Sequence, residues 1–371
     1  MGGLPNKAPA LALALALAGC GGESPFSLTG TLSAPRHGHT ATLLPSGRVL
    51  IAAGLTKTSP LGSLEVYDPA RGAFHALPPA SIRPRGWHRA ARLRDGRVLL
   101  TGGWADAHTA LREAALIGPG GSHEGGPLMR HGRYDHTATL LRDGTVLVTG
   151  GNDGRRELRS MEIFDPGTGA FEETARPLLI PRQLHTATPL PDGRVLIVGG
   201  GRGEGERFAE IYDPRERRTR LARSATSIPR SRHTATRLAD GKVLIAGGLG
   251  PERTLASAEI FDPASEKFTP LQAPMRTERQ QHTATLLPDG RVLLVGGWGG
   301  EGRTLAEGEF FDPAGGCFAP LPSAMQHERR LHSATLLEGG RILIAGGASD
   351  KDVLTSAEIF TIPPRGEGSS C

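Results

Sequence analysis

Residues 279–297 read RQQHTATLLPDGRVLLVGG, and variants of this stretch recur seven times along a chain of 371 residues. Each copy joins a polar start containing Arg and His to two β-rich runs that flank an Asp-Gly-type turn, the pattern of a β-hairpin. Successive motif histidines are 49, 48, 49, 48, 49 and 50 residues apart. This constant period indicates one supersecondary unit stacked many times. The motif histidines are His39, His88, His136, His185, His233, His282 and His332.

The rest of each repeat supplies two further strands. In the sixth copy a polar, Gly-rich loop precedes a short run at 306–311, an Asp-Pro turn and a last run at 318–321. No segment shows a sustained 3.6-residue apolar period, so we expect almost no helix. Four short antiparallel strands cannot bury both faces alone, and such units cover one another around an axis. We therefore predict an all-β fold of four-stranded antiparallel blades.

The quoted motifs resemble those of kelch-repeat β-propellers, particularly the bacterial variety with Arg-x-x-His-Thr-Ala-Thr, Asp-Gly-Arg-Val-Leu, Gly-Gly and Ala-Glu-Ile-Phe-Asp-Pro in each blade. The resemblance covers roughly residues 26–362 and implies seven blades. The first copy departs at Ala53-Gly54, and the second departs at 88–91 and 115–119, so its outer half is expected to be less regular.

The two ends of the repeat region predict how the ring closes. Residues 26–28 match the fourth strand of a repeat, whereas the chain's last apolar run, 357–360, matches a third strand. The last blade should therefore combine three C-terminal strands with one N-terminal strand, which removes exposed sheet edges.

Composition agrees with a single propeller outside the cytoplasm. The 52 Gly and 29 Pro suit a chain of turns and short strands, and seven repeats leave no room for a second globular domain. The net charge is +5, but charged residues of both signs are dispersed along the chain without a basic run, so we expect no nucleic-acid partner. We expect a monomer.

The N-terminus resembles a bacterial lipoprotein signal. A short apolar run at 10–18 ends in Leu17-Ala18-Gly19-Cys20 and is too short to span a membrane. The resemblance implies that residues 1–19 are removed and that Cys20 is lipidated, with 20–25 as a tether, 26–362 as the propeller and 363–371 as a tail. An ordinary signal peptide with an incidental Cys is the alternative. Gly21 favours anchoring to an outer membrane, with the protein periplasmic or surface-exposed in the cell envelope.

Two cysteines remain in the mature chain, Cys317 and Cys371. An oxidising compartment permits a bridge between them, and two free thiols are equally consistent with the sequence.

The recurring charged residues are expected to be mainly structural. An Arg stands three residues before each motif His, and a Glu opens the third strand of six repeats, so each of these Glu can pair with an Arg. These rings of Arg and His could alternatively bind an anion or a metal. Ala115 takes the Glu position in the second repeat, so Arg85 or Arg133 is expected to lack its usual partner unless Glu113 substitutes. The motif arginines are Arg36, Arg85, Arg133, Arg182, Arg230, Arg279 and Arg329.

Aromatic residues gather beside these arginines and form a candidate recognition patch. Its aromatic members are Trp87, Trp104, Trp298 and Tyr134, and its charged members are Arg85 and Arg133. Exposed aromatics beside Arg suit sugars, peptides or anionic polymers. The alternative is that these rings only pack locally.

Catalytic signatures are few. Galactose oxidase, a propeller relative, implies a copper site with a Cys-Tyr crosslink, a second Tyr and two His, but this chain has only Tyr67, Tyr134 and Tyr212 and no suitable cysteine. The G-x-G-x-x-G match at 297–302 precedes a strand rather than a helix, so it is interpreted as a loop. We expect no cofactor.

Three functions remain open. The leading hypothesis is a lipid-anchored, non-enzymatic binding or scaffold propeller that presents a loop-rich face to a protein or glycan of the cell envelope. The alternative is a carbohydrate-active enzyme of epimerase or lyase type, with Arg binding a carboxylate and His or Glu moving the proton. A purely structural envelope protein is the third.

Overall fold

Each repeated motif folds into the predicted hairpin, and its second strand is buried apart from Arg341 in the seventh copy. In the sixth copy β23 (Thr283–Leu286) pairs antiparallel with β24 (Val292–Val295), and Gly290 in the turn has a φ of 88°. All four residues of β24 are buried, because this strand packs against a neighbouring blade on each face. The computed structural model describes residues 24–78, 82–106, 109–201 and 206–364.

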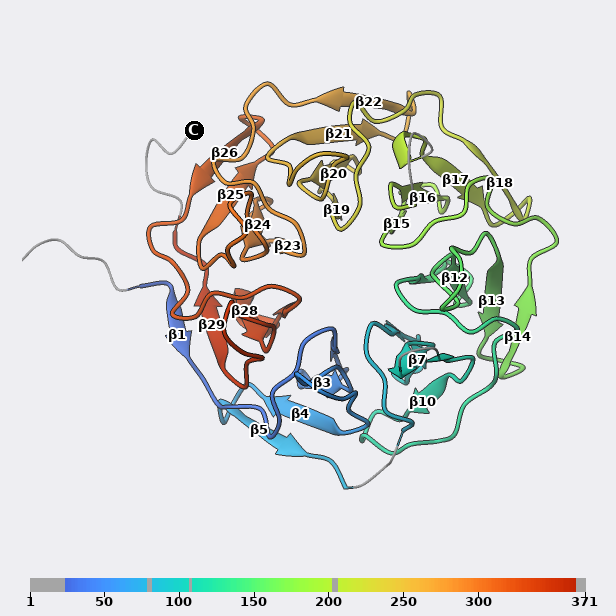
Figure 1. Ribbon diagram of the computed structural model, residues 1–371, viewed down its shortest axis with the longest axis horizontal. Helices are drawn as coiled ribbons and strands as arrows, with labels where there is room; N and C mark the ends of the chain where they lie inside the picture. Colours follow the sequence, from blue (N-terminus) through green and yellow to red (C-terminus); the bar gives the residue numbers. More distant parts are fainter. Residues whose placement is uncertain (1–23, 79–81, 107–108, 202–205, 365–371) are drawn as a thin grey trace, which may run out of the picture.

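The hairpins are arranged as seven blades around a central axis (Figure 1), as predicted. In blades one to three the strands are β2 (Thr40–Leu43), β3 (Val49–Ala52), β4 (Leu64–Asp68), β5 (Ala73–Ala76), β6 (Arg89–Arg92), β7 (Val98–Thr101), β8 (Trp104–Asp106), β9 (Thr109–Ala110), β10 (Ala115–Ile117), β11 (Thr137–Leu140), β12 (Val146–Thr149), β13 (Met161–Asp165) and β14 (Ala170–Glu173). In blades four to seven they are β15 (Thr186–Pro189), β16 (Val195–Val198), β17 (Glu210–Asp213), β18 (Arg218–Leu221), β19 (Thr234–Arg237), β20 (Val243–Ala246), β21 (Ala258–Asp262), β22 (Lys267–Pro270), β23, β24, β25 (Gly308–Asp312), β26 (Cys317–Pro320), β27 (Ser333–Leu336), β28 (Arg341–Ala345) and β29 (Ala357–Thr361), with a short 3-10 turn η2 (Glu338–Gly340).

The ring closes through its N-terminal strand. The strand β1 (Phe26–Leu28) pairs antiparallel with β29, with Phe26 opposite Phe360. The two phenyl rings lie 4.9 Å apart between centroids, and both side chains are buried. The seventh blade therefore has the order β1-β29-β28-β27, as the repeat pattern predicts.

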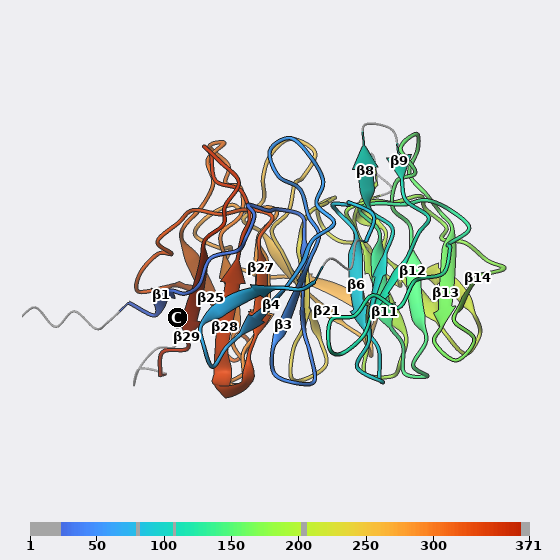
Figure 2. The same cartoon turned by 90° about the horizontal axis from the view of Figure 1, so that it is seen from below.

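Blade two is the irregular one. Its main sheet has three strands, β10-β7-β6, and the fourth strand is reduced to two isolated bridges, Ile117 with His123 and Glu113 with Leu128. Turn residues explain the loss, since Gly125 has a φ of 84° and Pro127 cannot donate to a ladder. The same blade carries an extra hairpin, β8–β9, which rises above the face of the disc (Figure 2).

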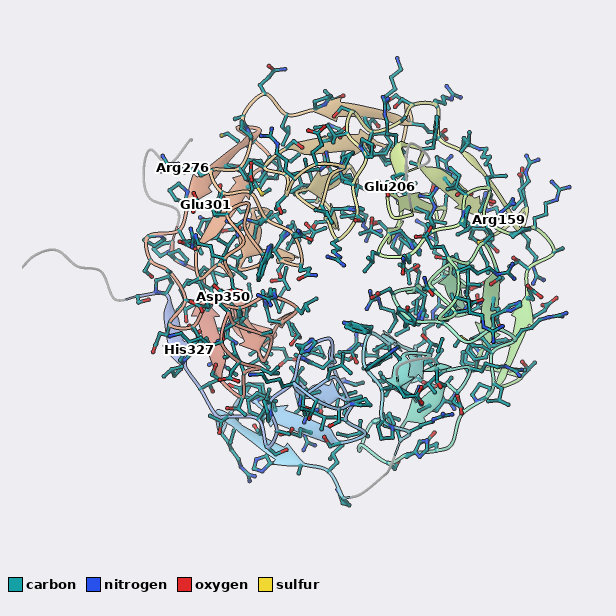
Figure 3. The ribbon with its side chains drawn as sticks, viewed as in Figure 1. Arg159, Glu206, Arg276, Glu301, His327 and Asp350 are labelled. Carbon is teal, nitrogen blue, oxygen red and sulfur yellow. The ribbon has the colours of Figure 1, made fainter. Side chains whose placement is uncertain are left out.

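The hydrophobic core is divided into clusters between adjacent blades, whereas charged side chains such as Arg159 and Arg276 lie toward the rim (Figure 3). Among the described residues no helix is long and apolar enough to cross a membrane. Cys317 at the start of β26 is disulfide-bonded. Cys20 and Cys371 lie outside the described residues, so lipidation and the Cys317–Cys371 bridge stay predictions.

Candidate functional site: an axial pocket

The motif histidines form a belt that ties each blade to the next. The Nε2 atom of each ring lies within hydrogen-bonding distance of a hydroxyl on the preceding blade, for example 2.9 Å from Thr40 to His88. The Ser333 hydroxyl lies 2.9 Å from His39 and completes the circle. Burial lowers the pKa of these histidines, to about 3 for His39 and His233, so the rings are neutral at physiological pH. The belt is therefore structural.

A second belt is made by the residue just before each motif His. In every blade this residue has a left-handed backbone, with φ between 52° and 58°. Its N–H donates to the carbonyl oxygen of its counterpart in the preceding blade, as from Asp135 to Trp87 and from Leu184 to Asp135, and the hydrogen bonds close into a ring. The backbone is thus uniform while the side chain is free to vary, and we call these residues the axial ring. The axial ring is Gly38, Trp87, Asp135, Leu184, Arg232, Gln281 and Leu331.

The motif arginines are paired within their blades, as expected. Six of the seven form buried ion pairs with the Glu of the third strand, for instance Arg133 with Glu162 at 2.6 Å and Arg230 with Glu259 at 2.9 Å. The same carboxylates accept backbone N–H groups of the loop that enters the blade. The six pairs are Arg36–Glu65, Arg133–Glu162, Arg182–Glu210, Arg230–Glu259, Arg279–Glu309 and Arg329–Glu358.

Arg85 of blade two departs from this scheme. Ala115 stands opposite Leu100 at the register position of the missing Glu. Arg85 is buried and donates to the carbonyl oxygens of Gly102 and Glu113 at 2.9 and 2.8 Å. Burial lowers the pKa of its guanidinium to about 10. The carboxylate of Glu113 pairs with Arg83 at 2.5 Å, so Glu113 serves Arg85 mainly through its backbone oxygen.

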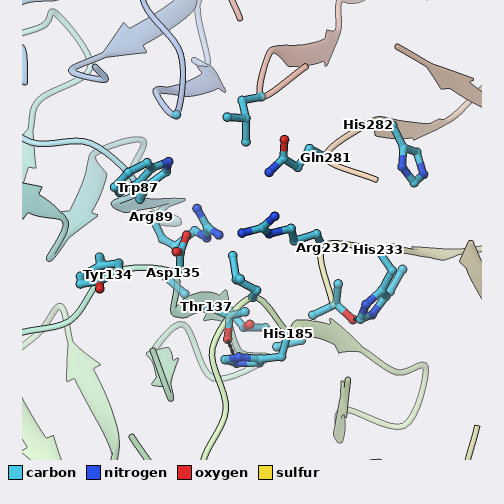
Figure 4. A pocket seen from close by; sticks show the side chains of 18 of the residues that line it. Trp87, Arg89, Tyr134, Asp135, Thr137, His185, Arg232, His233, Gln281 and His282 are labelled. Atoms are coloured by element: carbon cyan, nitrogen blue, oxygen red, sulfur yellow. Dashed lines mark hydrogen bonds between the residues drawn. The ribbon is translucent and has the colours of Figure 1, made fainter. Parts of the chain in front are cut away.

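The axial ring opens onto a pocket of about 710 Å³ around the central axis. Its charged side chains are Arg89, Asp135 and Arg232, and Figure 4 shows the two guanidinium groups facing each other near the centre with Asp135 beside Arg89. Trp87 and Tyr134 line one side. Cationic, anionic and aromatic groups therefore converge on one pocket, the usual character of a ligand site.

Arg89 occupies a position that the fold reserves for a hydroxyl residue. Its counterparts in the other blades are Thr or Ser, and each of those hydroxyls contacts a motif His of the next blade. With Arg at position 89, His136 instead meets the hydroxyl of Thr101 on the neighbouring strand β7, at 2.8 Å. The structural hydrogen bond is kept by a second residue, which frees position 89 for a cation in the pocket.

Two opposing influences act on the pKa of the Asp135 carboxyl. Burial raises the pKa of its carboxyl, and the charges of Arg89 and Arg232 oppose that rise. Within the described part of the chain its carboxylate accepts no hydrogen bond. Burial likewise lowers the pKa of Arg89, offset in part by Asp135. A carboxyl with a raised pKa next to two cations is suited to proton transfer close to a bound anion.

The predicted binding residues are brought together only in part. Trp87 lies 5.5 Å from Trp104 and 6.2 Å from Tyr134 between ring centroids. Trp298 is not in the pocket and stacks under Arg330, 4.0 Å away. Arg85 and Arg133 are fully buried in the networks described above rather than at the pocket surface. Sequence reasoning missed Asp135, Arg232 and Arg89. The signal that could have found them is that each stands directly beside a motif His, at a position where the residue type differs from its counterparts in other repeats.

No family model matches the chain, and no curated protein is significantly similar to it in sequence. Among solved structures, the fold matches a fungal alcohol oxidase of the AA5 family in complex with copper, with a TM-score of 0.76 and 18% sequence identity, over 93% of this chain and 78% of that chain. The protein is therefore a seven-bladed β-propeller structurally close to that oxidase. Likeness at this identity shows the fold, which serves many functions.

The residues of this chain do not fit the copper site that the resemblance to galactose oxidase implies. The described residues include no cluster of three or more His, Cys, Asp or Glu side chains that could hold a metal ion. The Nε2 atoms of the motif histidines already lie against hydroxyl groups, and Tyr67 and Tyr212 are buried in their blades, away from the pocket lining. We derive no step through copper.

The comparison corrects our leading expectation about function. The sequence favours a non-enzymatic binding or scaffold propeller over an enzyme. The solved structure that this chain resembles is an enzyme, which overturns that preference.

Proposed function

We propose that the protein is a carbohydrate-active enzyme of epimerase or lyase type that acts on an acidic sugar in the axial pocket. The convergence of Arg89, Asp135 and Arg232 carries the proposal. Two guanidinium groups suit the planar carboxylate of a sugar acid, because Arg can donate two parallel hydrogen bonds to it.

Epimerisation and elimination of a sugar acid share their first step. The Asp135 carboxylate takes the proton from the carbon next to the sugar carboxylate, and the electron pair of that C–H bond moves onto the carboxylate oxygens. Arg89 and Arg232 stabilise the added negative charge, which is the most effective contribution a preorganised site makes. A raised pKa makes Asp135 a stronger base than an ordinary aspartate.

The second step separates the two reactions. In a lyase the electron pair forms a carbon–carbon double bond, the adjacent C–O bond breaks, and the departing oxygen takes a proton. Tyr134 lines the pocket, and burial raises the pKa of its phenol, so it holds a proton to donate. In an epimerase a proton is instead donated to the opposite face of the carbon, for which Tyr134 is the proton-bearing group in the pocket, and Asp135 releases the proton it took to solvent. No bond of the sugar backbone breaks.

The experiment incubates the protein with uronic acids and their oligomers. Ultraviolet absorbance of the new conjugated double bond reports a lyase, and proton NMR in D2O reports an epimerase through deuterium at the carbon next to the carboxylate. We expect one of these signals from the native protein and at least a ~100-fold loss in Asp135→Asn, the usual contribution of a general base. Equal rates in the two proteins contradict the role of Asp135, and no signal from any acidic sugar contradicts the function.

We also propose that the repeat is of the kelch type and that the protein is lipid-anchored in the cell envelope through Cys20. The support is the repeat motif together with the apolar run that ends at Leu17-Ala18-Gly19-Cys20. Several acyl chains would hold the protein stably on a membrane leaflet. Labelling of the native protein but not of Cys20→Ala by a palmitate analogue is expected, and equal labelling contradicts the anchor.

A further inference from the structure

Three aromatic side chains cluster at one side of the axial pocket, and we call Trp87, Trp104 and Tyr134 the aromatic wall. Trp87 and Tyr134 line the pocket, and Trp104 contacts the ring of Trp87. The ring of Trp87 contacts both others, with centroid distances of 5.5 and 6.2 Å. All three residues are half-buried, so part of each remains open to solvent. Figure 4 shows Trp87 and Tyr134 on the same side of the pocket as Asp135.

The wall is a local addition to the repeat rather than part of its core. Leu184 and Leu331 stand where blade two has Trp87, and Leu55 and Leu249 stand where it has Trp104. The added rings are accommodated by special features of the neighbouring backbone. A Cβ on Gly38 would come within 2.8 Å of the Trp87 ring, so the glycine leaves the space in which that indole lies.

Trp104 belongs to the extra hairpin of blade two. It begins β8, pairs with Ala110 of β9, and the hairpin stands above the face of the disc (Figure 2). The aromatic wall therefore extends from the pocket upward toward the open face. A ligand seated at the arginines and longer than one ring would lie along it.

The wall is continuous with the charged part of the pocket. Trp87 and Arg89 are separated by one residue, His88, and Tyr134 directly precedes Asp135. The pocket volume of about 710 Å³ falls within the range of roughly 300–1,000 Å³ that holds ligands of drug size. This is more space than one sugar ring occupies.

We infer that the aromatic wall is a stacking subsite for the sugar ring next to the acidic one, so that the substrate is an acidic oligosaccharide rather than a free sugar acid. This inference rests on the proposed function. The C–H groups on one face of a pyranose ring pack against an aromatic face, whose negative quadrupole attracts their partial positive charge. The arginines hold the carboxylate, and the wall sets which end of the chain lies outward.

The test compares matched monosaccharides and trisaccharides by isothermal titration calorimetry, using galacturonic acid with trigalacturonic acid and mannuronic acid with trimannuronic acid. The native protein should bind the trisaccharide of one pair about tenfold more tightly than its monosaccharide, the effect of one well-placed ring contact. Trp87→Leu and Trp104→Leu should bring that ratio close to one. Leucine already stands at equivalent backbone positions in other blades, so both variants should fold, which circular dichroism checks.

Trp298→Leu is the matched control, because Trp298 follows Gly-Gly as Trp104 does but stacks against Arg330, whereas Trp104 contacts the pocket residue Trp87. Its trisaccharide ratio should equal that of the native protein. Arg89→Thr, which restores the residue of the other blades, should weaken the monosaccharide and the trisaccharide alike. If Arg89→Thr weakens both ligands but the tryptophan variants leave the ratio unchanged, the stacking subsite is wrong and the proposed function survives. If the native protein binds neither pair, the proposed function fails, and the subsite with it.

Discussion

The form of Asp135 that favours stability differs from the form that favours reactivity: the neutral carboxyl is the more stable in the folded protein, and the ionised carboxylate is the base. Burial raises the pKa of the Asp135 carboxyl in the folded protein above its ordinary value of 3.8, so folding favours the neutral form. The resulting contribution to the free energy of unfolding is complete below pH 3.8 and is lost as the pH rises through the folded-state pKa. Asp135→Asn keeps the neutral form at every pH. Thermal melting at pH 7 should therefore show a higher midpoint for the variant while its activity is lost, a common exchange at active sites.

The pH dependence supplies the control for this prediction. The advantage of Asp135→Asn should disappear below about pH 3.8, the ordinary value for Asp, where the native carboxyl is neutral in both states. A variant that melts lower than the native protein at pH 7 would show that the ionised carboxylate is a stabilising partner of Arg89 and Arg232.

Thr101 is predicted to be needed only because Arg89 is present. Thr101→Ala leaves the buried Nε2 of His136 without its hydroxyl and should cost about 1–3 kcal/mol in the free energy of unfolding. Arg89→Thr restores the hydroxyl of the other blades, so the double variant should recover most of that loss. Urea unfolding of the four proteins in a double-mutant cycle measures the coupling. Additive losses would contradict the compensation.

The chemistry-bearing residues were hard to predict for a physical reason. Residues that recur in every repeat, such as Arg133 and His136, satisfy needs that every blade shares, and the structure shows them buried and paired. The axial ring instead fixes its backbone through hydrogen bonds and leaves the side chain unspecified. Asp135 and Arg232 therefore carry no repeat signal, and only the ring geometry shows that they meet.

At the scale of elements, the single strand β1 completes the seventh blade and should control the stability of the ring. Phe26 is 3% exposed and packs on Phe360, so Phe26→Ala should cost about 3–5 kcal/mol. Leu28 on the same strand is 53% exposed, and Leu28→Ala should change stability by less than about 0.5 kcal/mol. Chemical denaturation compares them. Equal, small effects would mean that the closure does not stabilise the ring.

Most strands could be predicted from the repeat, because the turn residues, the β-rich runs that flank them and the constant spacing of the copies all indicate the same hairpin. Blade two could be predicted only as irregular. Its fourth strand fails where Gly125 and Pro127 break the ladder, but the β8–β9 hairpin depends on tertiary context that the sequence pattern does not contain. The aromatic cluster of Trp87, Trp104 and Tyr134 could be predicted because the repeat alignment alone places these residues on one face.

At the scale of the whole molecule, the histidine belt predicts how stability depends on pH. The folded-state pKa of His39 and His233 is about 3, below the ordinary 6.5, so their contribution is complete above pH 6.5 and falls as pH drops toward 3. For each of the two histidines, the free energy of unfolding should fall by about 1 kcal/mol per pH unit as the pH drops within that window. Urea unfolding at pH 7.0, 6.0 and 5.0, values chosen to span roughly the upper part of the window, follows the loss.

Carboxylates lose their contribution to stability at a lower pH than the histidines do, so the two effects can be told apart. Glu266 pairs with Arg194 and Arg220, and its pKa is lowered from 4.5 to about 2, so its contribution is lost only below about pH 4.5. A loss of stability that begins below pH 4.5 rather than near 6.5 would contradict the neutral histidine belt.

At the scale of the whole molecule, the central proposal is that an acidic sugar binds on the axis of the propeller between two arginines. A crystal structure of Asp135→Asn with trigalacturonic or trimannuronic acid measures this directly, since the variant keeps the pocket and stops turnover. We predict a sugar carboxylate between Arg89 and Arg232 with the neighbouring ring against Trp87. A sugar bound on the outer surface of the blades, with the axial pocket free of it, would contradict the account.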